Sequence, residues 1–307
     1  MRNTALLIVV TGFLFLCQYG CRTHNSVEKV TDHFDSGTIN ISCDESFKPV
    51  IDQEVQVYCN SYPKANIIVH YKPEADCLRD FAVDSIRMVI ATRPYTKSEE
   101  TLMADSLHVG VNYGTLAYDA IAVVVNPKAK DSMFSMNEIR DLLSGKSKKN
   151  LVPVMDGVKA TSTVRYMLDS VLHGQNLGSN VVAAKNSQGV LDYVANTPNA
   201  VGFVGVSWIS NSEDTSESKY LKSIRVARLE STDYANGYVL PVQLFIYTKS
   251  YPMIRSLVYV IKENHLGLGH GFANFMLQDR GQLIFRRAYI FPAQRSFYVR
   301  DAQLDQD

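Results

Sequence analysis

The sequence has no excess of charge of either sign, because 31 basic residues balance 31 acidic residues in a chain of 307. This balance removes the usual electrostatic reason to expect nucleic acid or an acidic membrane surface as a partner. No repeat with a period of about 20 to 50 residues is present. With 46% apolar residues, the chain can form one large or two medium globular domains.

Motifs of common hydrolases are absent as well. The sequence contains no HExxH zinc motif, no GxSxG nucleophile elbow and no Walker-type phosphate loop. Its seven histidines are scattered, and His265 and His270 lack the spacing of zinc ligands. We therefore predict that the protein is not an enzyme and holds no metal or cofactor. An exported hydrolase is the rival class.

The apolar run at the amino terminus is shorter than a membrane-spanning helix. It covers residues 5–16, about 12 residues where a span needs roughly 20, and it follows Arg2. This pattern predicts a secretory signal over residues 1–21. Gly20-Cys21 is similar to the end of a bacterial lipoprotein signal, so we expect Cys21 to carry lipid and residues 22–37 to form a tether. A soluble secreted form is the alternative, because Gln18 stands where that pattern prefers leucine.

Three cysteines remain beyond residue 21. Cys43, Cys59 and Cys77 allow at most one internal disulfide and leave one thiol over. Their spacing fits no metal-ligand pattern. They are buried thiols, or one bridge with a free cysteine.

Strand and helix patterns alternate along the chain. The nearly continuous apolar sequence LAYDAIAVVV indicates a strand covered on both faces, and Ser135 with Glu138 has the spacing of a capping box. The alternation predicts an α/β fold with a largely parallel sheet. Strands are expected at 38–42, 66–71, 86–91, 116–125, 200–206, 238–248 and 256–261, and helices at 50–59, 76–83, 96–104, 136–143, 186–195 and 270–278.

Hydroxyl side chains stand at the start of another amphipathic helix. Thr161, Ser162 and Thr163 precede an apolar stripe over residues 164–172. Hydroxyls are good N-caps, and a helix start offers unpaired N–H donors and a partial positive charge. Together with Arg165, these residues form a candidate pocket for a small anion. An ordinary cap that faces water is the alternative.

Polar side chains also follow two of the predicted strands. Asp44, Glu45 and Ser46 come after the first strand, and Thr92 and Arg93 come after the third. In parallel α/β sheets, ligands bind beyond the carboxyl ends of the strands. These residues are therefore candidate ligand contacts. The alternatives are carboxylates that face solvent and an Arg93 that only forms a salt bridge.

Five blocks of sequence occur in order across residues 38–293. They are 84–94 (DSIRMVIATRP), 118–127 (YDAIAVVVNP), 135–145 (SMNEIRDLLSG), 200–205 (AVGFVG) and 267–281 (GLGHGFANFMLQDRG). As a set, they resemble the phosphate-binding proteins of bacterial ATP-driven (ABC) phosphate importers, the PstS-like group of periplasmic binding proteins.

The resemblance implies a two-lobed periplasmic binding protein fold, each lobe a mixed, mostly parallel sheet flanked by helices. Lobe one would be discontinuous, 38–117 plus 238–307, and lobe two would be 118–237. The ligand would lie in the cleft between them. Carried over residue by residue, the family's ligand contacts fall on the following positions: Ser46 in the first loop, Thr92 and Arg93 in the second, and Thr161, Ser162 and Thr163 at the helix start.

The sequence departs from the family in two places. Asp44 and Glu45 stand where the family has Gly and Ser, and the helix start lacks the central Gly. The register of Arg165 against the family's arginine is open by one residue. These departures affect the identity of the ligand more than the fold.

A carboxylate beside an oxyanion can accept the proton of hydrogen phosphate, which sulfate lacks. An unmatched buried acceptor costs about 1 to 3 kcal/mol or more, and a site built around such a bond can reject the wrong analogue by about 10⁴-fold. Asp44, Glu45, Asp119 and Asp156 are the candidates. The alternative for Asp119 is a cap or an ion pair at a crossover, and the alternative for Asp156, which precedes Gly157, is a turn residue.

The resemblance thus predicts a monomeric, lipid-anchored periplasmic protein that captures phosphate and delivers it to ABC permease subunits in the inner membrane. Sulfate, molybdate or arsenate are the alternative ligands. A sensor or adhesion lipoprotein that uses the same fold without transport is the alternative function.

Overall fold

The computed structural model of the protein describes residues 32–107, 111–157, 159–209, 222–233, 237–263 and 265–294. The predicted signal peptide (1–21), its Cys21 and residues 22–31 of the predicted tether lie outside these ranges. Within them, no helix has both the length and the apolar character needed to cross a bilayer.

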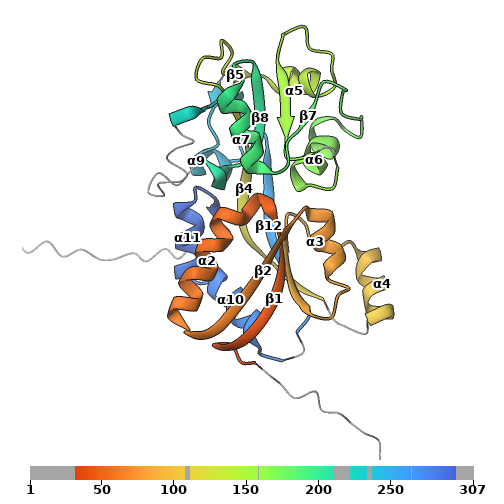
Figure 1. Cartoon of the computed structure of the whole chain (residues 1–307), viewed down its shortest axis with the longest axis vertical. Coiled ribbons are helices and arrows are strands. Elements are labelled where there is room, and N and C mark those ends of the chain that lie inside the picture. The colour runs from red at the N-terminus through yellow and green to blue at the C-terminus, as the bar shows by residue number, and fades with distance from the viewer. Residues whose placement is uncertain are drawn as a thin grey trace, which may run out of the picture. The chain divides into compact units, whose positions relative to one another are not determined.

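A mixed sheet forms the centre of the described body (Figure 1). Its strand order is β2-β1-β3-β12-β4-β8-β6-β7, with β9 and β13 each paired to β4. β1 is parallel to β2 and β3, and β6 is parallel to β7 and β8, whereas β12 is antiparallel to both of its neighbours. The strands are β1 (Ser36–Asp44), β2 (Lys64–Lys72), β3 (Ile86–Ala91), β4 (Asn112–Val125), β6 (Val152–Met155), β7 (Val182–Ala183), β8 (Ala200–Gly205), β9 (Arg225–Val226), β12 (Ile254–Ile261) and β13 (Phe291–Pro292).

Helices flank this sheet, and a small second sheet adjoins it. The second sheet has the order β11-β10-β5. Its strands are β5 (Met133–Phe134), β10 (Arg228–Glu230) and β11 (Tyr238–Val239). The helices are η2 (Glu45–Phe47), α2 (Lys48–Ser61), α3 (Glu74–Asp80), α4 (Lys97–Leu107), α5 (Met136–Leu143), α6 (Ser162–Tyr166), η3 (Met167–Val171), α7 (Ser187–Asn196), η4 (Val206–Trp208), α9 (Gln243–Tyr247), α10 (Leu268–Leu277) and α11 (Asp279–Arg287).

The long strand β4 belongs to both halves of the sheet. Residues 112–120 pair with β12, and residues 121–125 pair with β8. We call the half with β1, β2 and β3 the first lobe and the half with β6, β7 and β8 the second lobe; β4 and β12 connect them (Figure 1). The two-lobed, mixed α/β architecture predicted from the sequence is therefore confirmed.

Local sequence signals explain several elements. Ile86–Ala91 forms β3 with the predicted bounds. The predicted capping box is present at α5, where Ser135 accepts a hydrogen bond from Glu138 N and Glu138 accepts one from Ser135 N. The apolar half of β4 is fully buried, as expected for a strand with side chains packed on both faces. The described cysteines are all free thiols, with Cys43 and Cys77 buried.

The strand predicted at 238–248 is wrong beyond its first two residues. β11 ends at Val239, and α9 follows as a helix over Gln243–Tyr247. Pro241 explains the break, because proline has no N–H to donate to a strand ladder. Val239 and Ile246 pack in the same core as Ile121 and Phe203 of the second lobe. The predicted lobe limits stay a prediction, and this packing favours a longer second lobe.

Candidate functional site

The end of β1 supplies the first part of the candidate site. Asp44 is the last residue of the strand, and its Oδ1 accepts a hydrogen bond of 3.1 Å from Ser46 N. The turn places Ser46 in the short helix η2, directly before α2, where its side chain is fully buried. Asp44 is also buried, yet its Oδ2 has no hydrogen-bond partner among the described residues. A buried carboxylate oxygen thus remains without a hydrogen-bond partner at the carboxyl end of β1.

The start of α6 supplies the second part. Thr161 caps the helix through a 3.2 Å bond from Val164 N, as the hydroxyl-rich sequence predicted. Thr161 and Thr163 each donate to Asp156, at 2.9 and 3.2 Å. Ser162 is fully buried and its Oγ lies 3.3 Å from Ser46 Oγ, across the two lobes. The hydroxyls therefore face inward rather than toward water.

Arg255 on β12 joins these two parts, and the sequence reasoning missed it. Its Nε donates to Asp119 Oδ2 at 2.9 Å, and its Nη1 donates to Ser162 Oγ at 2.8 Å. The Phe47 ring lies beneath the guanidinium, 5.0 Å from ring centroid to Cζ. Arg255 Nη2 is buried without a hydrogen-bond partner in the described part of the chain.

Asp44 Oδ2 and Arg255 Nη2 are thus two unsatisfied polar atoms in one buried cluster. Gly205 keeps the space beside Arg255 open, because a Cβ there would lie 3.0 Å from Arg255 Nη2 and 3.3 Å from Ser46 O. A buried donor or acceptor without a partner costs about 1 to 3 kcal/mol, and more when charged. One small anion that carries a proton would satisfy both atoms, since it can accept from the guanidinium and donate to the carboxylate.

Electrostatics separate the two carboxylates nearest the site. Burial, with the nearby Glu74 charge, raises the pKa of Asp44 to about 7, although Arg255 opposes the shift. Burial would also raise the pKa of Glu74, but hydrogen bonds and charge from Arg165, with hydrogen bonds from Thr92, hold it below its usual value. Asp44 therefore keeps its proton to a higher pH than an ordinary aspartate, and Glu74 stays ionised.

Glu74 gathers two of the predicted residues into a second group. Thr92 donates to Glu74 Oε1 from its N at 2.9 Å and also from its hydroxyl. Arg165 Nε donates to Glu74 Oε2 at 2.6 Å, and its Nη2 donates to Thr92 Oγ1 at 2.6 Å. Thr92 and Arg165 lie together, held by a carboxylate that the sequence reasoning did not single out.

Glu45 and Arg93 bond elsewhere. Glu45 Oε2 accepts from Ser187 Oγ at 2.9 Å and from Ser187 N at 3.3 Å, at the start of α7. Burial raises the pKa of Glu45. Arg93 forms a two-point ion pair with Glu99, at 2.9 and 3.0 Å. The structure does not bring the Arg93 guanidinium to the Asp44–Arg255 cluster.

No local signal marked Arg255 or Glu74 as a site residue. A charged residue directly before an apolar run such as SLVYVI is common, because charges often flank strands. The predicted strand began at 256 and so left out Arg255, and Glu74 lies at the start of α3.

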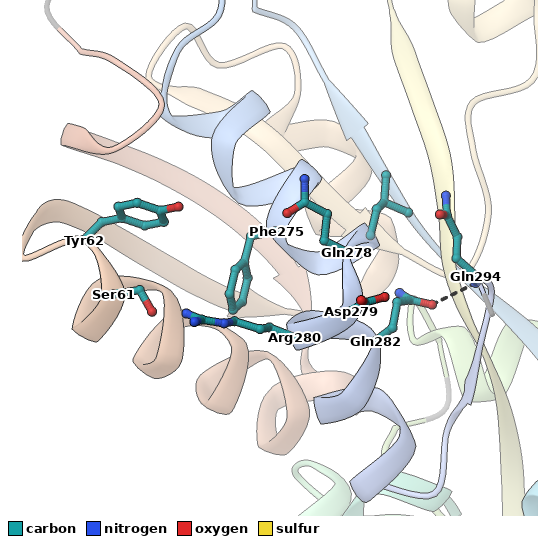
Figure 2. A pocket seen from close by; sticks show the side chains of 9 residues that line it. Ser61, Tyr62, Phe275, Gln278, Asp279, Arg280, Gln282 and Gln294 are labelled. Atoms are coloured by element: carbon teal, nitrogen blue, oxygen red, sulfur yellow. Dashed lines mark hydrogen bonds between the residues drawn. The ribbon is translucent and has the colours of Figure 1, made fainter. Parts of the chain in front are cut away.

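A separate cavity of about 590 Å³ lies where α2 meets α10 and α11 (Figure 2). Its lining includes Tyr62, Phe275 and Arg280. Gln282, also in the lining, donates to Leu116 O and Met276 O and accepts from Gln294 N. Because this amide is already satisfied by the backbone, the cavity offers a weaker case for a ligand than the Asp44–Arg255 cluster. In the described ranges, no group of three His, Cys, Asp or Glu residues is arranged to hold a metal ion.

Comparisons with known proteins agree with this architecture. A family model described as the PBP superfamily domain matches residues 30–280. No curated protein matches the sequence.

Solved structures with the same fold are distant in sequence. A putative phosphate ABC transporter substrate-binding protein from Clostridium perfringens, solved with bound phosphate, has a TM-score of 0.70 at 19% identity; the match covers 84% of this chain and 100% of that one. An ABC-type phosphate transport receptor from Vibrio cholerae has a TM-score of 0.60 at 15% identity and covers 83% and 100%. A possible phosphate-binding protein from Planctomyces limnophilus has a TM-score of 0.56 at 17% identity and covers 84% and 94%.

Proposed function

Because the chain belongs to the PBP superfamily domain family, we propose that it is the substrate-binding component of an ABC importer and captures inorganic phosphate between its lobes. The observation that carries this proposal is the pair of unsatisfied buried atoms, Asp44 Oδ2 and Arg255 Nη2. The described functions of the Clostridium perfringens and Vibrio cholerae proteins support it. In this account the protein binds and releases its ligand unchanged, and is not an enzyme.

The ligand contacts follow from the cluster. Arg255 supplies a charged donor, Ser46 and Ser162 supply hydroxyls, and the other lone pairs of the anion accept from backbone N–H groups at the start of α6. The carboxylate of Asp44 accepts a hydrogen bond from the O–H group of the ligand.

Other residues act indirectly. Asp119 acts through Arg255, which it orients by the 2.9 Å bond to Nε. Thr161 and Thr163 shape the helix start, where both donate to Asp156. Glu45, Thr92, Arg93 and Arg165 stay proposed contacts that would have to exchange a present partner for the ligand.

A carboxylate in this position favours an anion that still carries a proton. Phosphate carries one near neutral pH, whereas sulfate and molybdate do not. Against a fully ionised anion, Asp44 would have to be protonated and donate instead. Sulfate or molybdate is the second candidate ligand, because burial raises the pKa of Asp44 and a protonated side chain would donate to a fully ionised anion.

The proposal includes the cellular setting. The leader at residues 1–21 would direct export, and Cys21 would carry the lipid. The tether predicted over residues 22–37, whose last two residues belong to β1, would hold a monomeric body in the periplasm beside its permease. A sensor lipoprotein with the same site would bind phosphate equally well, so growth on limiting phosphate after deletion of the gene separates the two roles.

The test is equilibrium dialysis of the purified chain against labelled phosphate. We expect one mole bound per mole of protein, and a large loss of affinity in Ser162→Asp, whose added charge repels an anion at the helix start. Thr101→Asp, on the exposed face of α4, is the control and should bind normally. Equal binding by the wild type and Ser162→Asp would place the site elsewhere.

A further inference from the structure

An ion pair connects the two lobes outside the Asp44–Arg255 cluster. Glu74 begins α3 in the first lobe, and Arg165 lies in α6 of the second lobe. Arg165 Nε donates to Glu74 Oε2 at 2.6 Å, and Nη2 donates to Oε1 at 3.4 Å. The Arg165 side chain is 35% exposed, whereas Glu74 is buried. The pair therefore sits where the region between the lobes meets solvent.

Groups of the first lobe fix the Glu74 carboxylate before Arg165 reaches it. Thr92 N and Thr92 Oγ1 both donate to Glu74 Oε1. These bonds hold the carboxylate in one orientation, so the guanidinium meets a preformed acceptor and loses less freedom on pairing. Burial would raise the pKa of Glu74, but Arg165 and, to a smaller extent, these Thr92 bonds hold it below its usual value.

We infer that Glu74 and Arg165 form a latch that holds the lobes closed through contacts of the chain alone. Two further hydrogen-bonded contacts join the lobes, and one of them lies directly beside the latch. Ala75 N donates to Ala160 O at 3.0 Å, next to Glu74 in sequence, and Glu45 accepts from both donors of Ser187. None of these bonds needs an atom from outside the chain, so they favour closure before a ligand enters.

The exposure of Arg165 sets how the latch behaves. The Arg255–Asp119 pair is buried and stays intact when the lobes separate, because β4 and β12 pair at these residues. Arg165 can instead return to water, where Asp169, 3.5 Å from its Nη1, offers a weak alternative partner. Opening therefore exchanges one partner for another, and salt should promote it because an accessible pair is screened.

The consequence is a slow exit for any ligand held between the lobes. Charged hydrogen bonds that exist only in the closed form raise the barrier to opening. Because the same bonds hold the ligand-free protein closed, their loss should speed both the entry and the release of the ligand. For Arg165→Gln we expect release on the order of tenfold faster, a value kept small by the exposure of the pair.

The test measures closure in phosphate-free protein by small-angle X-ray scattering, so its result does not depend on which ligand binds. Wild type should show the radius of gyration of the closed form, and both Arg165→Gln and Glu74→Gln should increase it. Arg93→Gln is the matched control, because Arg93 follows Thr92 in the chain and also forms a two-point ion pair, but with Glu99 of its own lobe. Its radius should stay at the wild-type value.

Circular dichroism confirms that each variant is folded, and the double variant Glu74→Gln/Arg165→Gln should open the lobes no further than either single change. An identical radius for the wild type, Arg165→Gln and Glu74→Gln would overturn the latch, and so would a wild type already in the open form. A protein that closes through this pair but binds no phosphate would refute the proposed function and leave the latch intact.

Discussion

Arg255 on β12 and Asp119 on β4 face each other directly across the antiparallel pairing of the two strands that connect the lobes. Arg255 Nε donates to Asp119 Oδ2 at 2.9 Å, and the side chains are 3% and 0% exposed. The pair occupies the connection between the lobes and leaves Nη1 and Nη2 for the site. One buried ion pair thus links the connecting strands β4 and β12 to the proposed ligand contact.

Arg255→Gln should abolish phosphate binding and destabilise the fold. The change removes the charged donor and leaves Asp119 as a buried charge without its partner, which costs about 3 to 5 kcal/mol. Urea unfolding and equilibrium dialysis measure the two effects separately. Lys149→Gln, which breaks a more exposed pair with Glu138, should lose less than about 1 kcal/mol and keep its affinity. A stable Arg255→Gln protein with normal affinity would contradict the account.

Asp44 should make stability fall as pH rises through the acid range. Its carboxyl releases a proton near pH 3.8 when unfolded and near pH 7 when folded. Between these values the folded state holds a proton that the unfolded state has lost, so the free energy of unfolding decreases from about pH 4 to about pH 7. Asp44→Asn should remove this part of the slope in urea titrations taken at several pH values. An unchanged slope would show that Asp44 titrates normally.

Asp44→Asn should also reduce the discrimination between phosphate and sulfate. The amide can still accept through its oxygen, but it can donate as well, so the penalty against an anion without a proton largely disappears. Competition dialysis with both anions measures the ratio of affinities. Full retention of the wild-type ratio would assign the proton-reading role to another carboxylate.

Gly205→Ala should weaken phosphate binding with a smaller effect on stability. The backbone at Gly205 is extended, at φ −61 and ψ 145, so alanine fits the conformation, but its methyl group would lie 3.0 Å from Arg255 Nη2. We expect an affinity loss of at least tenfold, measured through the fluorescence of Trp208, the single tryptophan, whose Nε1 donates to Ser46 O. Gly189→Ala is the control, since its added Cβ meets neighbours at an ordinary 3.4 Å. Equal affinities in both variants would show that the space beside Nη2 is not used.

The buried carboxyl group of Glu54 should lower the free energy of unfolding of the protein. It is buried on α2, and neither carboxylate oxygen has a hydrogen-bond partner among the described residues. Burial raises its pKa well above 4.5, so folding retains a proton and stability falls as pH rises from that value. Glu54→Met should raise the free energy of unfolding at pH 7 by about 1 to 3 kcal/mol and flatten the pH dependence.

Gln56→Met is the control for that change, because residue 56 is exposed on the same helix. It should alter the free energy of unfolding by less than about 0.5 kcal/mol. A loss of stability in Glu54→Met would mean that the carboxyl has a stabilising role in the core.

The local elements were predictable where one signal dominated. Ile86–Ala91 is a continuous apolar run, and Ser135 with Glu138 fixes a helix start by hydrogen bonds three residues apart. The alternating pattern at 238–248 misled, because Pro241 ends the strand and a helix buries Ile246 instead. A period of two over so few residues does not separate a strand from a helix.

The site was predictable only in part, for a related reason. The helix start was predictable, because hydroxyl side chains are common N-caps and occupy positions 161–163. Arg255 is 93 positions from Ser162 in the chain and enters the site only because β12 pairs with β4. Glu74 likewise gains its role from Arg165, 91 positions away. Contacts of this kind depend on strand pairing and lobe packing, which no local pattern encodes.

The central claim is that the Asp44–Arg255 cluster binds a small oxyanion, and isothermal titration calorimetry of the purified protein with phosphate, sulfate and molybdate tests it most directly. We predict one site with a clear heat for phosphate, weaker binding of the other two anions at pH 7, and no heat for any of them in Arg255→Gln. No heat from the wild type with any of the three anions would contradict the account.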